Sequence, residues 1–160
     1  MRTQRWILLP LLMACNAASV FGAESHNHSQ GDHVTGGLKL DHGKKWPTDL
    51  SLRKGMTEIR VALEAKKGAI HLSKLPAGGY VQLGEKVSRT LSLIFKNCKL
   101  KPEADAMLHI LLARILNGAA KMKNETNSAE QAKGASAVEA ALSEYPKFFD
   151  HPGWRPMKGE

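Results

Sequence analysis

The sequence predicts an all-α fold, an antiparallel up-down-up-down four-helix bundle that follows a flexible N-terminal segment. Three observations support this prediction. Four stretches between residues 48 and 151 carry apolar residues at steps of three and four, which is typical of one buried helix face. Short links join these stretches, as in up-and-down bundles. No segment alternates apolar and polar residues for long enough to form a strand.

The first two helices are predicted over residues 50–66 and 80–98. Thr48 or Asp49 can accept hydrogen bonds from the free amides at the start of the first helix. The link between the helices, residues 67–79, contains a proline and two adjacent glycines that interrupt a helix. The apolar faces consist of Leu52, Met56, Ile59 and Leu63 in the first helix and of Tyr80, Val87, Leu91, Ile94 and Cys98 in the second.

The third and fourth helices are predicted after two further short links. Pro102 suits the first position of a helix, where its missing amide would have no partner. Residues 124–128 separate the third helix from the fourth. Pro146 removes an amide and clashes with the preceding turn, so the fourth helix is expected to kink or stop near Glu144. The apolar faces consist of Ala104, Leu108, Leu111, Ile115 and Met122 in the third helix and of Ala132, Ala135, Val138, Leu142 and Tyr145 in the fourth.

The first 22 residues predict export. Arg2 and Arg5 precede an apolar run at residues 6–14, and small residues follow, which is the order found in a secretory signal peptide. The mature protein is therefore expected to be periplasmic or secreted. An alternative is cleavage before Cys15, because the preceding residues resemble a lipoprotein box; the protein would then be a membrane-anchored lipoprotein.

The expected order along the chain is a signal peptide (1–22), a flexible tether (23–47), the bundle (48–151) and a C-terminal tail (152–160). Cleavage leaves 138 residues, enough for one domain, with 21 basic and 15 acidic side chains and a net charge of +6. After the signal peptide no stretch is long and apolar enough for a membrane span.

The net charge limits the classes of partner. A modest positive charge suits an acidic envelope protein or an anionic lipid surface. Lys and Arg are spread along the chain and form no basic tract, so nucleic acid is not an expected partner.

The tether contains histidines at a spacing that can bind metal. His26 and His28 form an H-x-H pair, and His33 follows. Imidazole is a good ligand for copper, nickel and zinc, so these residues are candidate ligands of a transition metal ion. The alternative is that they are solvated linker residues, because a short motif without a scaffold binds metal weakly.

A second candidate metal site joins Cys98 and His109 across the turn between the second and third helices. A thiolate and an imidazole suit a soft metal ion. Two simpler interpretations stand beside it. Cys98 lies on an apolar stripe, where burial makes a thiol unreactive. His109 can pair with Asp105, four residues earlier on the same helix.

Met56 near the start of the first helix invites comparison with a haem protein. The length, the helix order and Met56 resemble cytochrome b562 and related exported bundles, over about residues 50–151. This resemblance implies haem held between Met56 and a histidine at the end of the fourth helix. The sequence departs from that pattern, because residues 144–148 contain no histidine; His151 reaches Met56 only if the tail folds back. Residues 46–56 and 97–109 also resemble small exported bacterial proteins of undefined role.

No motif for catalysis is present. The chain has no phosphate-binding glycine loop, no G-x-S-x-G and no H-E-x-x-H, so an enzyme is not expected. The sequence therefore predicts an exported, non-enzymatic helical binding protein that handles copper, nickel or zinc. One alternative is a cofactor-free basic interaction module that docks on an acidic envelope partner, with Trp46 and Trp154 as exposed anchors. The other is a haem-binding electron-transfer protein similar to cytochrome b562.

Overall fold

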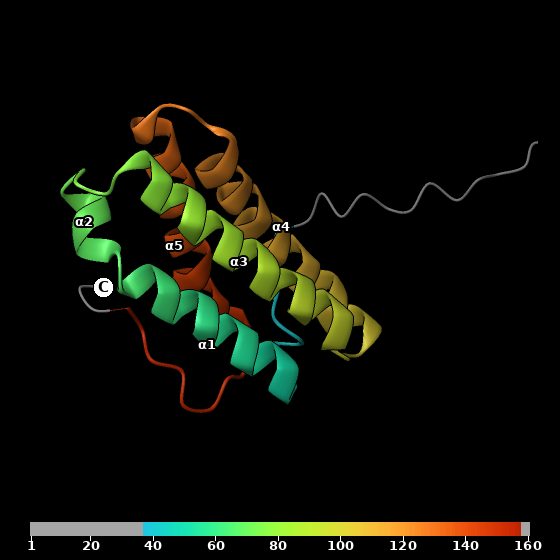
Figure 1. Ribbon diagram of the computed structural model, residues 1–160. Helices are drawn as coiled ribbons and strands as arrows, with labels where there is room; N and C mark the ends of the chain where they lie inside the picture. Colours follow the sequence, from blue (N-terminus) through green and yellow to red (C-terminus); the bar gives the residue numbers. More distant parts are fainter. Residues whose placement is uncertain (1–36, 158–160) are drawn as a thin grey trace, which may run out of the picture. The chain divides into compact units, whose positions relative to one another are not determined.

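The regular secondary structure of the described chain is entirely helical in the computed structural model, which describes residues 37–157. The helices are α1 (Leu50–Glu64), α2 (Lys67–His71), α3 (Ala77–Asn97), α4 (Pro102–Asn124) and α5 (Ser128–Phe148). Figure 1 shows the four long helices side by side, with the short α2 at one end. The all-α prediction is therefore confirmed for these residues. None of their helices is long and apolar enough to cross a membrane.

Several sequence predictions lie outside the described residues. They are the signal peptide at residues 1–22, the alternative lipoprotein site at Cys15, and the tether histidines His26, His28 and His33. The last part of the predicted tether is described, and it packs on the helices. Leu38 and Trp46 contact the core, and the backbone of Trp46 pairs with that of Phe149 after α5.

The predicted core is confirmed. Each of the apolar residues expected at its centre is at most 1% exposed, namely Leu52, Met56, Ile59, Leu63, Val87, Leu91, Ile94, Leu108, Leu111, Ile115, Val138 and Leu142. Burial of one such side chain stabilises the fold by about 1.5–3 kcal/mol. The link between α1 and α3 adds Ile70 and Leu75 to this core. The burial of Ile70 holds α2, which lies in this link, against the long helices.

The fourth long helix differs from its prediction. It was expected to kink or stop near Glu144, and it continues through Pro146 to Phe148. A proline so close to the end removes only one helical hydrogen bond. The last turn is held by other bonds, because the Phe149 amide donates to the Tyr145 carbonyl (3.0 Å) and the Trp46 amide donates to the Phe148 carbonyl (2.8 Å).

Glycines set the closest approach between α4 and α5. A Cβ atom added to Gly118 would lie 2.6 Å from the carbonyl oxygen of Gly134, and one added to Gly134 would lie 2.7 Å from the carbonyl oxygen of Gly118. Real side chains do not tolerate such distances to backbone atoms. The two helices therefore touch backbone to backbone at this point.

Candidate functional site

A groove between α1 and α3 gathers three lysines and is called the lysine groove below. It has a volume of about 480 Å³. Its walls consist of Ser51, Lys54, Gly55 and Glu58 from α1, of Thr90, Leu93, Ile94, Lys96 and Asn97 from α3, and of Lys99 from the turn that follows.

The helical repeat explains why these residues share one groove. Ser51, Lys54 and Glu58 follow one another at steps of three and four, so they lie on one face of α1. Gly55 and Ile94 form the bottom of the groove, where α1 and α3 lie close together. A Cβ atom on Gly55 would lie 2.7 Å from the Cδ1 atom of Ile94, so the absence of a side chain lets α3 approach α1 closely.

The charges in the groove are unbalanced. Glu58 accepts a hydrogen bond from the ammonium group of Lys86 at 2.6 Å, so its charge is already compensated. Lys54, Lys96 and Lys99 form no ion pair with any carboxylate of residues 37–157. Three ammonium groups around one hollow create a positive potential that attracts an anion.

Asp49 fixes the end of the lysine groove where α1 begins. Its carboxylate accepts a hydrogen bond from the Leu52 amide (2.7 Å), which caps α1, and another from the Lys99 amide (2.6 Å). One side chain thus ties the start of α1 to the turn after α3. The same carboxylate affects Cys98, because burial and then the charge of Asp49 raise the pKa of its thiol to about 12.

The lysine groove was not predicted from the sequence. Lys54 lies more than forty residues from Lys96 and Lys99, and the lysines were judged to be scattered. A signal was available, since Lys54 is in the first half of one predicted helix and Lys96 is at the end of the next. Neighbouring helices of opposite direction bring such positions together.

Cys98 and His109 line one small cavity of about 160 Å³ between α3 and α4. The His109 ring lies 5.7 Å from that of Phe95, and its Nδ1 atom lies 3.2 Å from the Asp105 carboxylate. Cys98 is half-buried, at the end of the apolar stripe on which the sequence placed it. The structure therefore brings the two predicted metal ligands to the lining of one cavity, and metal binding there stays a prediction from the sequence.

Residues 37–157 contain no group of three or more His, Cys, Asp or Glu side chains arranged to hold a metal ion. The proposed ligands His26, His28 and His33 lie outside this part of the chain. The helical domain itself thus offers at most a pair of ligands, Cys98 and His109. Two ligands without further donors give a weak site.

The tail folds back onto α1, as a haem site between Met56 and His151 would require. The surroundings of the two residues differ. Met56 is fully buried in the core. His151 has both ring nitrogens near hydroxyl groups, with Nδ1 at 3.1 Å from Tyr145 Oη and Nε2 at 3.5 Å from Thr57 Oγ1. Both ring nitrogens of His151 thus face hydroxyl groups of the chain, and haem binding by Met56 and His151 stays a prediction from the sequence.

Aromatic rings fasten the tail to the helices. The ring of Tyr145 stacks on that of Phe149 (5.3 Å) and meets the edge of the Trp154 ring (4.9 Å), and the guanidinium of Arg60 lies 6.0 Å from the Trp154 ring centre. Burial raises the pKa of Tyr145 and lowers that of His151, so both groups are neutral near pH 7. This neutral, hydrogen-bonded cluster holds the tail against the helices.

The two tryptophans expected as exposed anchors are half-buried instead. Trp154 packs against the ring of Tyr145, and the indole of Trp46 donates a hydrogen bond to the Lys39 carbonyl at 2.6 Å. Their rings are occupied by contacts within the chain. Neither tryptophan is therefore an exposed anchor for a partner.

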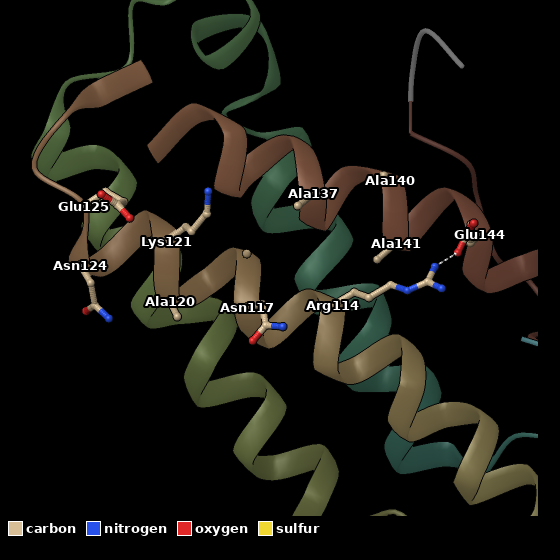
Figure 2. A pocket seen from close by; sticks show the side chains of 11 residues that line it. Arg114, Asn117, Ala120, Lys121, Asn124, Glu125, Ala137, Ala140, Ala141 and Glu144 are labelled. Carbon is tan, nitrogen blue, oxygen red and sulfur yellow. Dashed lines mark hydrogen bonds and ion pairs between the residues drawn. The ribbon is translucent and has the colours of Figure 1, made fainter. Parts of the chain in front are cut away.

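A second and larger hollow, of about 700 Å³, lies between α4 and α5. Figure 2 shows alanines such as Ala137 and Ala140 along its α5 wall, with the ion pair of Arg114 and Glu144 at one end. Lys121, at the other end, lies 3.5 Å from the carboxylate of Glu130. The two cations on this rim are thus paired, in contrast to those of the lysine groove.

No protein-family model matches this chain, and no curated protein or solved structure is similar to it at a significant level. The site has to be interpreted from its own geometry. Among the hollows described above, the lysine groove alone is lined by several cations that lack an ion-pair partner in the described chain.

Proposed function

We propose that this protein is an exported, non-enzymatic binding module that docks on an anionic partner at the cell envelope through its lysine groove. The observation that carries this proposal is the set of three groove lysines, Lys54, Lys96 and Lys99, which have no ion-pair partner among residues 37–157. Three ammonium groups around one hollow attract an anion, so an anionic ligand is the natural occupant.

We also propose the antiparallel up-down-up-down bundle as the scaffold. Contacts between successive long helices support it, because they pair early residues of one helix with late residues of the next. Gly55 in α1 contacts Ile94, and Glu58, further along α1, pairs with Lys86, earlier in α3. The same reversal holds between α4 and α5, since Arg114 pairs with Glu144 and Lys121 with Glu130.

Neutralising the groove lysines tests the function. The variant K54Q/K96Q/K99Q should bind poly-L-glutamate about ten-fold more weakly than the wild type, and vesicles that contain phosphatidylglycerol about 100-fold more weakly, because several exposed charge contacts are lost. The matched control is K66Q/K74Q/K123Q, which removes the same charge near the opposite ends of the helices. The proposal is contradicted if the wild-type protein binds neither poly-L-glutamate nor the vesicles, or if both variants weaken binding equally.

Metal binding by the tether stays a prediction from the sequence. Deletion of residues 26–33 should abolish copper or nickel binding and leave the thermal unfolding midpoint nearly unchanged, since these residues are not expected to contribute to the core. Isothermal titration calorimetry of the intact and shortened mature proteins measures metal binding, and thermal denaturation followed by circular dichroism measures the midpoint. Equal metal binding by the two proteins contradicts the prediction and directs attention to Cys98 and His109.

A further inference from the structure

Two large apolar side chains stand beside the lysine groove and are open to solvent. Leu50, the first residue of α1, is 72% exposed, and Leu93, which lines the groove from α3, is 57% exposed. Leu50 lies one helical turn before Lys54, so the two side chains share a face of α1. Exposed leucines next to lysines form a surface that is apolar and cationic at once.

The groove has donors for an anion and few competing acceptors. The hydroxyl group of Ser51 and the ammonium groups of the three groove lysines can all donate. The side-chain amide of Asn97 donates to the Leu93 carbonyl (2.9 Å), and Glu58 is compensated by Lys86. A volume of about 480 Å³ is suited to a small polar group that enters from outside.

The presence of both lysines and exposed leucines distinguishes an anionic membrane from an acidic polypeptide as the partner. An acidic polypeptide would satisfy the lysines but would leave Leu50 and Leu93 without apolar contacts. An anionic membrane satisfies both, because basic residues bind its charged headgroups while leucines enter the boundary with the acyl chains. The stems of lysine side chains also tolerate that boundary, since they keep their ammonium groups in the polar layer.

We infer that the lysine groove binds the anionic headgroup of a phospholipid and that Leu50 and Leu93 insert beside it, so that the protein docks on the surface of an anionic membrane. Lys54, Lys96 and Lys99 contact the phosphodiester. This inference rests on the proposed function, because it specifies the anionic partner of the same groove.

Vesicle binding by the mature protein tests the inference. We expect binding to vesicles of phosphatidylglycerol and phosphatidylcholine in equal parts, and none to phosphatidylcholine alone. The variant L50S/L93S should bind about ten-fold more weakly, because the leucines no longer leave water on binding. The variant K54Q/K96Q/K99Q should bind about 100-fold more weakly, since each lysine near such a surface contributes about five-fold.

The control variant is L72S/L116S, which removes two exposed leucines away from the lysine groove and should bind vesicles like the wild type. All substituted side chains are exposed, so circular dichroism and the unfolding midpoint are expected to stay close to those of the wild type. Raising the salt concentration provides a second measurement. It should weaken binding of the wild type but leave a residual affinity that L50S/L93S lacks, because salt screens charges and not apolar insertion.

The outcomes separate this inference from the proposed function. Binding to poly-L-glutamate through the lysines without binding to vesicles overturns the lipid inference and leaves the proposed function intact. The same holds if inorganic phosphate alone perturbs the groove, as seen by nuclear magnetic resonance, while vesicles do not bind. Vesicle binding that L50S/L93S does not weaken also overturns it, since the attraction is then electrostatic only. Absence of binding to all of these probes overturns both.

Discussion

The contact between α4 and α5 and the surface contacts of α1 are made by different groups. Gly118 and Gly134 bring α4 and α5 together backbone to backbone. On its surface, α1 is attached by polar side chains, namely Asp49 at its start, Glu58 along its length, and His151 of the tail beside Thr57. Figure 1 shows that the tail runs along α1.

This difference shows how one helical domain can combine a backbone contact between two helices with polar contacts at the surface of another. The closest atoms at the glycine contact are the two backbone carbonyl oxygens, which do not titrate, so pH and salt affect it little. In addition to its buried apolar face, α1 is attached at its surface by polar and charged side chains, which leave the lysine groove open beside it. The hollow between α4 and α5 has paired charges on its rim, such as Arg114 with Glu144, and therefore little attraction for an anion.

The largest expected effect comes from breaking the glycine contact. Gly118→Ala places a Cβ atom 2.6 Å from the Gly134 carbonyl oxygen, so α4 and α5 must separate. We expect a loss of about 2–3 kcal/mol in the free energy of unfolding, measured with urea. Gly68→Ala is the control, because nothing lies within 4 Å of its Cβ position, and it should be neutral or slightly stabilising. Equal stability of both variants would show that α4 and α5 adjust freely.

Removal of the Asp49 carboxylate tests the attachment of α1 at its start. Asp49→Ala should cost about 1–2 kcal/mol, because α1 loses its cap and the Lys99 amide loses its acceptor. It should also lower the pKa of Cys98 from about 12 and speed up its alkylation. Asn127→Ala, which removes the corresponding cap of α5, should cost about 1 kcal/mol and leave Cys98 unchanged.

The raised pKa of Cys98 also predicts the direction of an alkaline effect. The folded thiol holds its proton up to about pH 12, whereas the unfolded thiol loses it near pH 9. Stability is therefore fully present below pH 9 and falls as the pH rises toward 12. In Asp49→Ala this alkaline loss should be smaller. An unchanged alkylation rate in that variant would show that Asp49 does not act on the thiol.

The tail should loosen in acid because of His151. Burial, followed by the charges of Arg53 and Arg60, lowers the pKa of His151, and only Asp150 opposes them. A lowered pKa means that stability is present above about pH 6.5 and is lost as the pH falls, because the unfolded chain binds the proton more readily. We expect a loss below about 1 kcal/mol, given the partial exposure of the ring.

His151→Gln checks this origin of the acid effect. Gln can still form hydrogen bonds with Tyr145 and Thr57 but does not titrate, so stability should depend less on pH between 7 and 5. His71→Gln is the control, since His71 is exposed and pairs with Glu139 on α5, away from the tail. An identical acid profile for wild type and His151→Gln would exclude His151 as the cause.

The smallest effect concerns the second hollow. Glu144→Gln removes the partner of Arg114 on an exposed rim, so stability should change by less than about 0.5 kcal/mol. The freed guanidinium should give the α4–α5 hollow a weak affinity for poly-L-glutamate, measurable in the K54Q/K96Q/K99Q background. If no affinity appears, an unpaired cation in a hollow does not suffice to attract an anion.

Much of the fold could be predicted because apolar spacing is a local property. The stripe that includes Leu91 and Leu108 identified buried faces without knowledge of their neighbours, and Pro102 marked the start of α4. The end of α5 could not be predicted. Whether Pro146 stops a helix depends on bonds to Trp46, a residue one hundred positions away.

The candidate site was harder to predict than the fold. Cys98 and His109 were correctly expected to be close, because one short turn separates their helices. His151 was expected near the start of α1 only if the tail folded back, and the aromatic contacts of Trp154 decided that. The groove lysines were missed, since nothing in their immediate neighbours marks them.

The sequence by itself determined the helices, their buried faces and the excess of positive charge, because each follows from local spacing or from composition. The tertiary structure decided which charges remain unpaired. Lys86 finds Glu58 and Arg114 finds Glu144 across helix boundaries, whereas Lys54, Lys96 and Lys99 meet around one hollow. Electrostatic pairing depends on distances of a few ångströms between residues far apart in the chain, and only the packing of the helices sets those distances.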